Sequence, residues 1–272
     1  MKNNRACKSF FVIFSIFLIS CSKDQLQNKK IKIEKITRNQ NDVCINQDIT
    51  LKKLPPYSFE EGVDKFTKIT KEYFRCQGNP LNPERIDESD PDNIKVYLDC
   101  QGSSKHSLPI INSDEGVYPQ LIDILNYIQK KTKKRVIITC AHRCPTHNSY
   151  ADFFNKDKFS KHMIGAEVDF YVEGMEHKPL EVTKTLLQYF KEKQKYKESK
   201  EYDFFEDTKS NLKNPILYNK EVKIRIYDFD EGRDFSNRHP YPYICLEVLY
   251  DKDKKEKVAY SWEKANKGFL QF

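Results

Sequence analysis

A short segment, residues 160–172, constrains this chain more than any other part of it. It places His162 and Asp169 seven residues apart on either side of Gly165, and an apolar run at residues 170–172 follows directly. Glycine lets the backbone turn sharply, and the apolar run predicts a strand, so we expect Asp169 where a loop enters a sheet. Because histidine and aspartate are both zinc ligands, the segment predicts a fold that aims two ligands at one ion.

The full pattern Ser-x-His-x-x-Gly-x-x-x-Asp at residues 160–169 resembles the zinc-binding motif of peptidase family M15. This family contains D-alanyl-D-alanine carboxypeptidases and dipeptidases and shares a fold with the hedgehog signalling domain. An upstream segment resembles the family's Tyr-Arg-Ser-Pro-x-x-Asn stretch through Arg143, Pro145 and Asn148. The resemblance covers about residues 110–250 and implies zinc as the cofactor.

The resemblance also implies roles for three polar residues. Arg143 and Asn148 fall in the substrate-binding stretch, where the arginine steadies a substrate carboxylate or a developing oxyanion. A plain alternative for Arg143 is an arginine paired with a carboxylate at the surface. Ser160 either hydrogen-bonds the substrate or holds the turn before His162.

The third zinc ligand departs from the family pattern, which has a histidine on a late strand. The best-placed segment, residues 243–247, has Cys245 at that position, and a thiolate is an able zinc ligand. His239, in the loop before this strand, is the second candidate. The family's general base also has no direct counterpart, and Asp234 and Glu247 are the candidates for that role.

This departure leaves two functions open. In the first, the chain is a zinc metallopeptidase of the D-Ala-D-Ala carboxypeptidase type that hydrolyses peptidoglycan stem peptides. In the second, the site has degenerated and the chain is a cell-wall binding or structural module. A third class, a lipoprotein that binds a partner protein, would use the charged insertion near residues 197–219.

The N-terminus predicts export and lipidation. Residues 1–8 carry three basic residues and no acid, and residues 10–20 form a mostly apolar run that is too short to span a bilayer. The run ends in Leu-Ile-Ser before Cys21, which resembles a bacterial lipobox. We therefore expect a signal peptide at residues 1–20, a lipid on Cys21, and a cell-envelope location, periplasmic or surface-facing, with a lipid anchor in a membrane.

The net charge limits the partners. The whole chain carries +7, and removal of three positive charges with the signal peptide leaves +4. A nucleic-acid-binding surface needs a dense basic patch, whereas here lysines are interspersed with acids, so we expect no nucleic-acid partner. Peptidoglycan and phospholipid headgroups are acidic and suit a weakly basic surface.

Six cysteines remain after export, and their state is open between disulfides and reduced, buried thiols. They are Cys44, Cys76, Cys100, Cys140, Cys144 and Cys245. If disulfides form, a bond between Cys76 and Cys100 is the first expectation, because each is followed by Gln-Gly. The spacing of cysteines and histidines over residues 140–147 does not suit a structural zinc site, and we expect His106 at the surface.

The remaining pattern predicts one α+β domain, with a small, mostly antiparallel central sheet flanked by helices. Residues 21–50 read as a polar tether and residues 51–272 as the domain. Expected helices lie at residues 59–74, 118–131 and 180–196, and expected strands at residues 94–98, 135–139, 221–227 and 243–250. Residues 79–92 and 197–219 are expected to be irregular.

Overall fold

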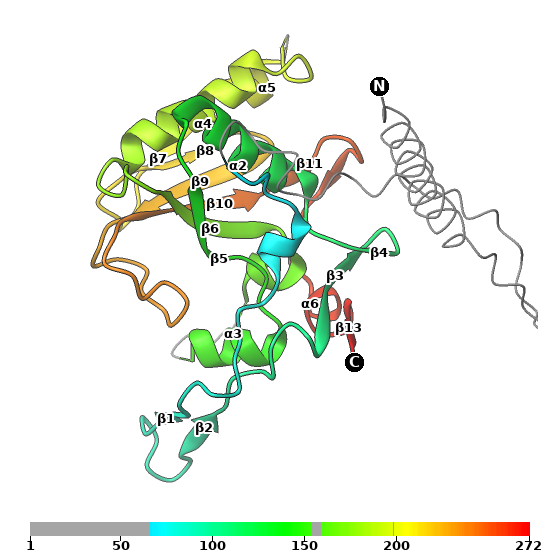
Figure 1. The fold of residues 1–272 in the computed structure, drawn as a ribbon, viewed down its shortest axis with the longest axis vertical. Coiled ribbons are helices and arrows are strands. Elements are labelled where there is room, and N and C mark those ends of the chain that lie inside the picture. The colour runs from blue at the N-terminus through cyan, green and yellow to red at the C-terminus, as the bar shows by residue number, and fades with distance from the viewer. Residues whose placement is uncertain (1–65, 154–158, 198) are drawn as a thin grey trace, which may run out of the picture. The chain divides into compact units, whose positions relative to one another are not determined.

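The computed structural model describes residues 66–153, 159–197 and 199–272 (Figure 1). The predicted signal peptide, the lipidation site Cys21 and the tether at residues 21–50 lie outside these residues. Among the helices of the described part, none combines the length and the apolar character that a membrane span requires.

A six-stranded antiparallel sheet forms the centre of the fold, in the strand order β5-β6-β10-β9-β8-β7. Together with a small number of helices it confirms the α+β prediction. The strands are β5 (Val136–Cys140), β6 (Glu167–Val172), β7 (Glu206–Thr208), β8 (Ile216–Tyr218), β9 (Val222–Tyr227) and β10 (Tyr243–Val248).

Two long helices cover one face of this sheet. Helix α2 (Pro119–Thr132) and helix α4 (Pro179–Glu192) contact each other, and both contact β10 (Figure 1). Each begins with proline at its first turn, where the missing N–H costs nothing. Their buried side chains, such as Leu125 and Leu186, join Phe170 and Leu246 of the sheet in the main core.

Side-chain alternation along the strands separates the core from a polar face. Val168 and Phe170 of β6 are fully buried in the core, so their neighbours Glu167 and Asp169 point to the opposite face. Asp169 therefore lies inside β6, and the expectation that it sits at the entry of a strand was wrong. The strand begins earlier because Glu167 is already paired with Glu247 of β10.

Smaller elements surround the sheet. The β1–β2 hairpin lies at the far end of the molecule from α4, and helix α3 lies between that hairpin and the sheet (Figure 1). These elements are η1 (Lys71–Phe74), β1 (Arg85–Asp87), β2 (Lys95–Tyr97), β3 (His106–Ile111), β4 (Asp114–Glu115), α3 (Pro145–Ala151), η2 (Lys161–Ile164), α5 (Lys200–Asp203), β11 (Tyr250–Asp251), β12 (Glu256–Lys257), α6 (Trp262–Lys267) and β13 (Phe269–Gln271).

Three segments differ from the expected secondary structure, and the first is residues 79–92, expected to be irregular, where Arg85–Asp87 form β1 and pair with β2. Of the predicted helix at residues 59–74, the described part is helical only in η1. The amide side chain of Asn126 explains this, because it bonds both the N–H and the carbonyl of Ile69 at 2.8 Å and holds that backbone extended. The insertion at residues 197–219 is not irregular throughout, since β7 and β8 extend the central sheet beside β9.

Candidate metal centre

The polar face of the sheet borders a cavity of about 500 Å³. Seven of the nine residues that the sequence proposed for catalysis, substrate binding or metal binding line it. They are Arg143, Ser160, His162, Asp169, Asp234, Cys245 and Glu247. The other two, Asn148 and His239, are not among the lining residues.

His162 is aimed at this cavity by a short helical turn. It lies in η2, where the Ser160 hydroxyl accepts a hydrogen bond from the His162 N–H at 3.2 Å. The helix ends at Gly165, whose φ of 68° is in the region that favours glycine. Imidazole Nδ1 lies 2.7 Å from the carbonyl oxygen of Ala141. Because that nitrogen donates to the carbonyl, Nε2 is the ring nitrogen that faces Asp169 and Glu167. Burial disfavours a charged ring, but Cys140, Glu167 and Asp169 outweigh burial and raise the pKa of His162, so Nε2 holds a proton that a bound metal would replace. Ser160 thus holds the turn, as one of its two predicted roles required.

Asp169 faces the same ring nitrogen. Its Oδ2 lies 3.4 Å from His162 Nε2 and accepts a hydrogen bond from the Asn237 amide at 2.8 Å. Its Oδ1 is buried and has no hydrogen-bond partner in the described part of the chain. Burial alone would raise the pKa of Asp169, but His162 outweighs burial and lowers it. A buried carboxylate oxygen without a donor is a natural contact for a cation.

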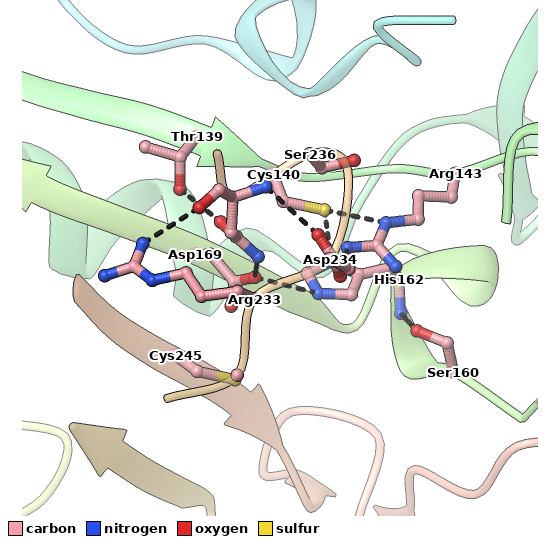
Figure 2. Close-up of polar contacts among 12 residues, drawn as sticks. Thr139, Cys140, Arg143, Ser160, His162, Asp169, Arg233, Asp234, Ser236 and Cys245 are labelled. Atoms are coloured by element: carbon pink, nitrogen blue, oxygen red, sulfur yellow. Dashed lines mark hydrogen bonds and ion pairs between the residues drawn. The ribbon is translucent and has the colours of Figure 1, made fainter. Parts of the chain in front are cut away.

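Cys245 lies directly opposite Asp169, on strand β10. Its thiol donates to Glu167 Oε1 at 2.9 Å, and the other oxygen of that carboxylate lies 3.8 Å from His162 Nε2. Burial, reinforced by the Glu167 carboxylate, raises the pKa of Cys245, so the thiol is neutral without a cation. Potential ligand atoms of Glu167, Asp169 and Cys245 lie within 4.8 Å of one another. Figure 2 shows Asp169, His162 and Cys245 reaching this region from β6, η2 and β10.

His239 does not join this group. Its ring packs against Tyr171 and Tyr243, with centroids 5.3 and 5.6 Å away. No group of potential metal ligands in the described residues includes it. The sequence left the third ligand open between His239 and Cys245, and the geometry favours the cysteine. Strand pairing places Cys245 opposite Asp169, whereas the loop carries His239 into an aromatic cluster.

Arg143 and Asp234 satisfy each other. The guanidinium bonds Asp234 Oδ2 at 2.5 Å, and its Nε donates to Cys140 Sγ at 3.0 Å (Figure 2). The Arg143 side chain is only 4% exposed. Arg143 therefore borders the cavity as a buried, paired group. It is not an unpaired arginine ready to bind a substrate carboxylate, and it is not an arginine at the surface. Asp234 is likewise engaged and is a poor candidate for the general base.

Glu247 is also paired. Lys161, Lys223 and Arg225 all lie within 3.0 Å of its carboxylate. Burial opposes ionisation, but these cations outweigh it and lower the pKa of Glu247. A carboxylate held this firmly in the charged form is a weak proton acceptor. The prediction of Glu247 as the base is therefore not supported by its surroundings.

Asn148 lies elsewhere. It is buried in α3, where its N–H donates to the carbonyl of Cys144 at 2.8 Å. Pro145 begins this helix, and Asn148, one helical turn later, is not among the residues that line the cavity. The predicted substrate-binding role of Asn148 has no geometric support.

Two residues of the site escaped the sequence reasoning. Glu167 has a detectable signal, because it lies two residues before Asp169 and a strand places such residues on one face. Cys140 is brought opposite Asp169 by an irregularity between Ile138 and Cys140 that re-aims its side chain. That irregularity depends on the pairing with β6 and leaves no trace in the sequence.

The residues present fit a zinc ion. In a tetrahedral site, nitrogen and oxygen ligands lie about 3.3–3.5 Å apart, and the His162–Asp169 distance is 3.4 Å. Cys140 lies on the other side of the ring, 3.6 Å from Nδ1, which is already bonded to Ala141. Nε2 faces the carboxylates of Asp169 and Glu167, at 3.4 and 3.8 Å, and Cys245 belongs with these two carboxylates to one group of potential ligands. This group combines carboxylate and sulfur donors that zinc accepts.

Comparison with protein-family models, curated proteins and solved structures finds no match for this chain. The arguments for its function are therefore those of its own geometry and of the motifs in its sequence.

The pairing of Arg143 predicts a structural role for this residue. Arg143→Ala leaves the Asp234 carboxylate without its buried partner and should lower the free energy of unfolding by about 3–5 kcal/mol. The control Arg135→Ala removes an ion pair with Glu173 that is more than half exposed and should cost less than ~1 kcal/mol. Urea denaturation measures both, and equal losses would contradict the buried pairing.

Proposed function

We propose that this chain is a zinc-dependent hydrolase of peptide bonds, with His162, Asp169 and Cys245 as the metal ligands. The observation that carries the proposal is the convergence of His162 Nε2 and Asp169 Oδ2, 3.4 Å apart, on one cavity. The motif around these residues resembles that of the D-alanyl-D-alanine peptidases, which share the hedgehog-like fold. This resemblance supports the choice of reaction. When bound, zinc lowers the pKa of a water to ~7 and polarises a scissile carbonyl.

Glu167 is the best-placed general base. One of its oxygens accepts from Cys245 and Arg225, while the other faces His162 Nε2 at 3.8 Å. Its carboxylate also lines the cavity. It is therefore placed to take a proton from water and to return it to the leaving amine. Glu167 is paired with Arg225 through one oxygen only, whereas Asp234 bonds the buried Arg143 and Glu247 is surrounded by three cations.

The proposed substrate class is the stem peptide of peptidoglycan. The predicted export and lipid anchor would hold the domain in the cell envelope, close to this polymer.

A second candidate function is a non-catalytic cell-wall binding module. The observation that favours it is the internal pairing of Arg143, whose Nη2 bonds Asp234 and whose Nε bonds Cys140, so that this arginine is already engaged where the family motif would use it on substrate. In this case the cavity binds a stem peptide without hydrolysing it.

Metal content tests the proposed ligands. In the purified full-length chain, His162→Ala and Cys245→Ser should each lower the zinc content by about one ion per chain, because three protein ligands are needed. His239→Ala is the matched control and should leave the zinc content unchanged. Elemental analysis gives the result, and full zinc retention in both ligand variants would refute the assignment.

Glu167→Gln tests the catalytic role separately. The amide keeps the size of the side chain but cannot take a proton, so release of D-alanine from a stem peptide should fall by about 10²–10⁴-fold with zinc retained. Glu173→Gln, at an exposed position just after β6, is the control and should retain activity. Full activity of Glu167→Gln would exclude it as the base. A zinc-loaded parent that binds the peptide without cleaving it would favour the binding module.

A further inference from the structure

A second cluster of potential metal ligands lies apart from the cavity. Cys76, Cys100, His106 and Cys144 each offer one ligand atom, and these atoms all lie within 4.8 Å of one another. Cys76 follows η1, Cys100 follows β2, His106 begins β3 and Cys144 immediately precedes α3. Four segments that are distant in the sequence thus converge on one point.

The spacing within the cluster is that of a tetrahedral zinc site. A zinc–sulfur bond of about 2.3 Å separates two thiolate ligands by about 3.8 Å, and a thiolate from an imidazole nitrogen by about 3.6 Å. In the structure, Cys76 Sγ and Cys100 Sγ are 3.8 Å apart, and Cys100 Sγ is 3.7 Å from His106 Nε2. We infer that Cys76, Cys100, His106 and Cys144 bind a structural zinc ion, separate from the proposed catalytic one.

The ring of His106 is oriented as a zinc ligand requires. Its Nδ1 lies 3.1 Å from the backbone carbonyl of Ser107, so this nitrogen donates and Nε2 is the ring nitrogen that faces Cys100 Sγ. Metal-bound histidines almost always donate their other N–H in this way. The expectation that His106 lies at the surface was wrong, since it is only 5% exposed.

Backbone N–H groups already surround the sulfur atoms. The N–H of Gly102 donates to Cys100 Sγ and the N–H of His147 donates to Cys144 Sγ, both at 3.4 Å. Such bonds stabilise thiolate over thiol and are the outer contacts that orient a metal ligand. Gly78 packs so closely on Cys100 that a Cβ at this position would overlap the sulfur.

Residues 77–105, which contain the β1–β2 hairpin, bury little apolar surface and contact the rest of the fold mainly through polar groups, such as the bond of Asp99 to His147. Between residues 77 and 105 the buried residues are Asp99 and Cys100 alone. Apolar side chains of this region, including Ile94, Val96 and Leu98, are more than half exposed. A segment that buries so little apolar surface needs another source of stability, and structural zinc sites supply it in small domains.

A disulfide between Cys76 and Cys100 explains less of this arrangement. It would use two of the four groups and leave Cys144 and His106 packed beside it without a role. None of the five described cysteines is in a disulfide. The zinc assignment instead uses every member of the cluster and accounts for the orientation of His106.

The site also bears on the cavity. Cys144 immediately follows Arg143, whose guanidinium lines the cavity and pairs with Asp234. A zinc ion on Cys144 would fasten the loop between β5 and α3 to the hairpin region, and so fix the position of Arg143.

The test is X-ray absorption spectroscopy at the zinc edge on purified, full-length His162→Ala. This variant removes the proposed catalytic zinc, so the spectrum reports the cluster alone, in a chain whose cluster is intact. We expect about one zinc per chain with three sulfur neighbours and one nitrogen neighbour. No zinc in this variant, or a zinc shell without sulfur, would overturn the inference.

Variants locate the ion. Cys100→Ser and Cys144→Ser should each lower zinc content by about one ion per chain, whereas Cys140→Ser, at the end of β5, should keep the cluster zinc. Peptide mapping after alkylation covers the case in which a cluster variant fails to fold. In the parent, Cys76, Cys100 and Cys144 should react only after a chelator is added, and a Cys76–Cys100 disulfide found instead would refute the site. If His162→Ala loses zinc and the cluster variants keep it, the structural site is refuted and the catalytic site is supported.

Discussion

The arrangement of the candidate metal centre depends on the alternation of side chains along β6. Val168 and Phe170 are buried against the helices, which fixes the register of the strand with a large apolar contribution. Glu167 and Asp169 are thereby committed to the opposite face, and the pairing with β10 sets Cys245 opposite Asp169. A slip of one residue would bury both carboxylates in the core, so the same packing that holds the sheet also positions the proposed ligands.

Charge balance is the second constraint on this face. Burying carboxylates is costly unless each has a partner. Glu247 has three cations, and Asp234 has Arg143. Asp169 has one amide donor and the imidazole of His162, and one of its oxygens lacks a donor in the described part of the chain. A divalent cation is the addition that completes this pattern, and it is the physical reason for favouring a metal here.

The sequence predicted the parts of the site that depend on local pattern. The motif around His162 and Asp169, and the strand that carries Cys245, could be inferred because apolar periodicity and a turn glycine are local signals. The pairing of Arg143 with Asp234 could not, since these residues are far apart in the sequence and meet only through the fold. For the same reason His239 stayed a candidate until the structure placed it among tyrosines.

The cysteine cluster shows the limit of spacing rules. Its ligands are separated by long segments, so no short motif marks them, and the local run at residues 140–147 divides between different environments. Cys140 lies beside His162, Cys144 belongs to the cluster, and His147 is bonded to Asp99 at 2.6 Å. Only the meeting of η1, β2, β3 and α3 in space reveals the set.

Anomalous X-ray diffraction at the zinc edge, from crystals of the full-length chain grown with zinc, tests the central claim most directly. The account predicts an anomalous peak in the cavity, within bonding distance of His162 Nε2, Asp169 and Cys245. Crystals in which the cavity residues are well ordered but show no anomalous peak would contradict the account. This face of the sheet would then be a metal-free binding surface.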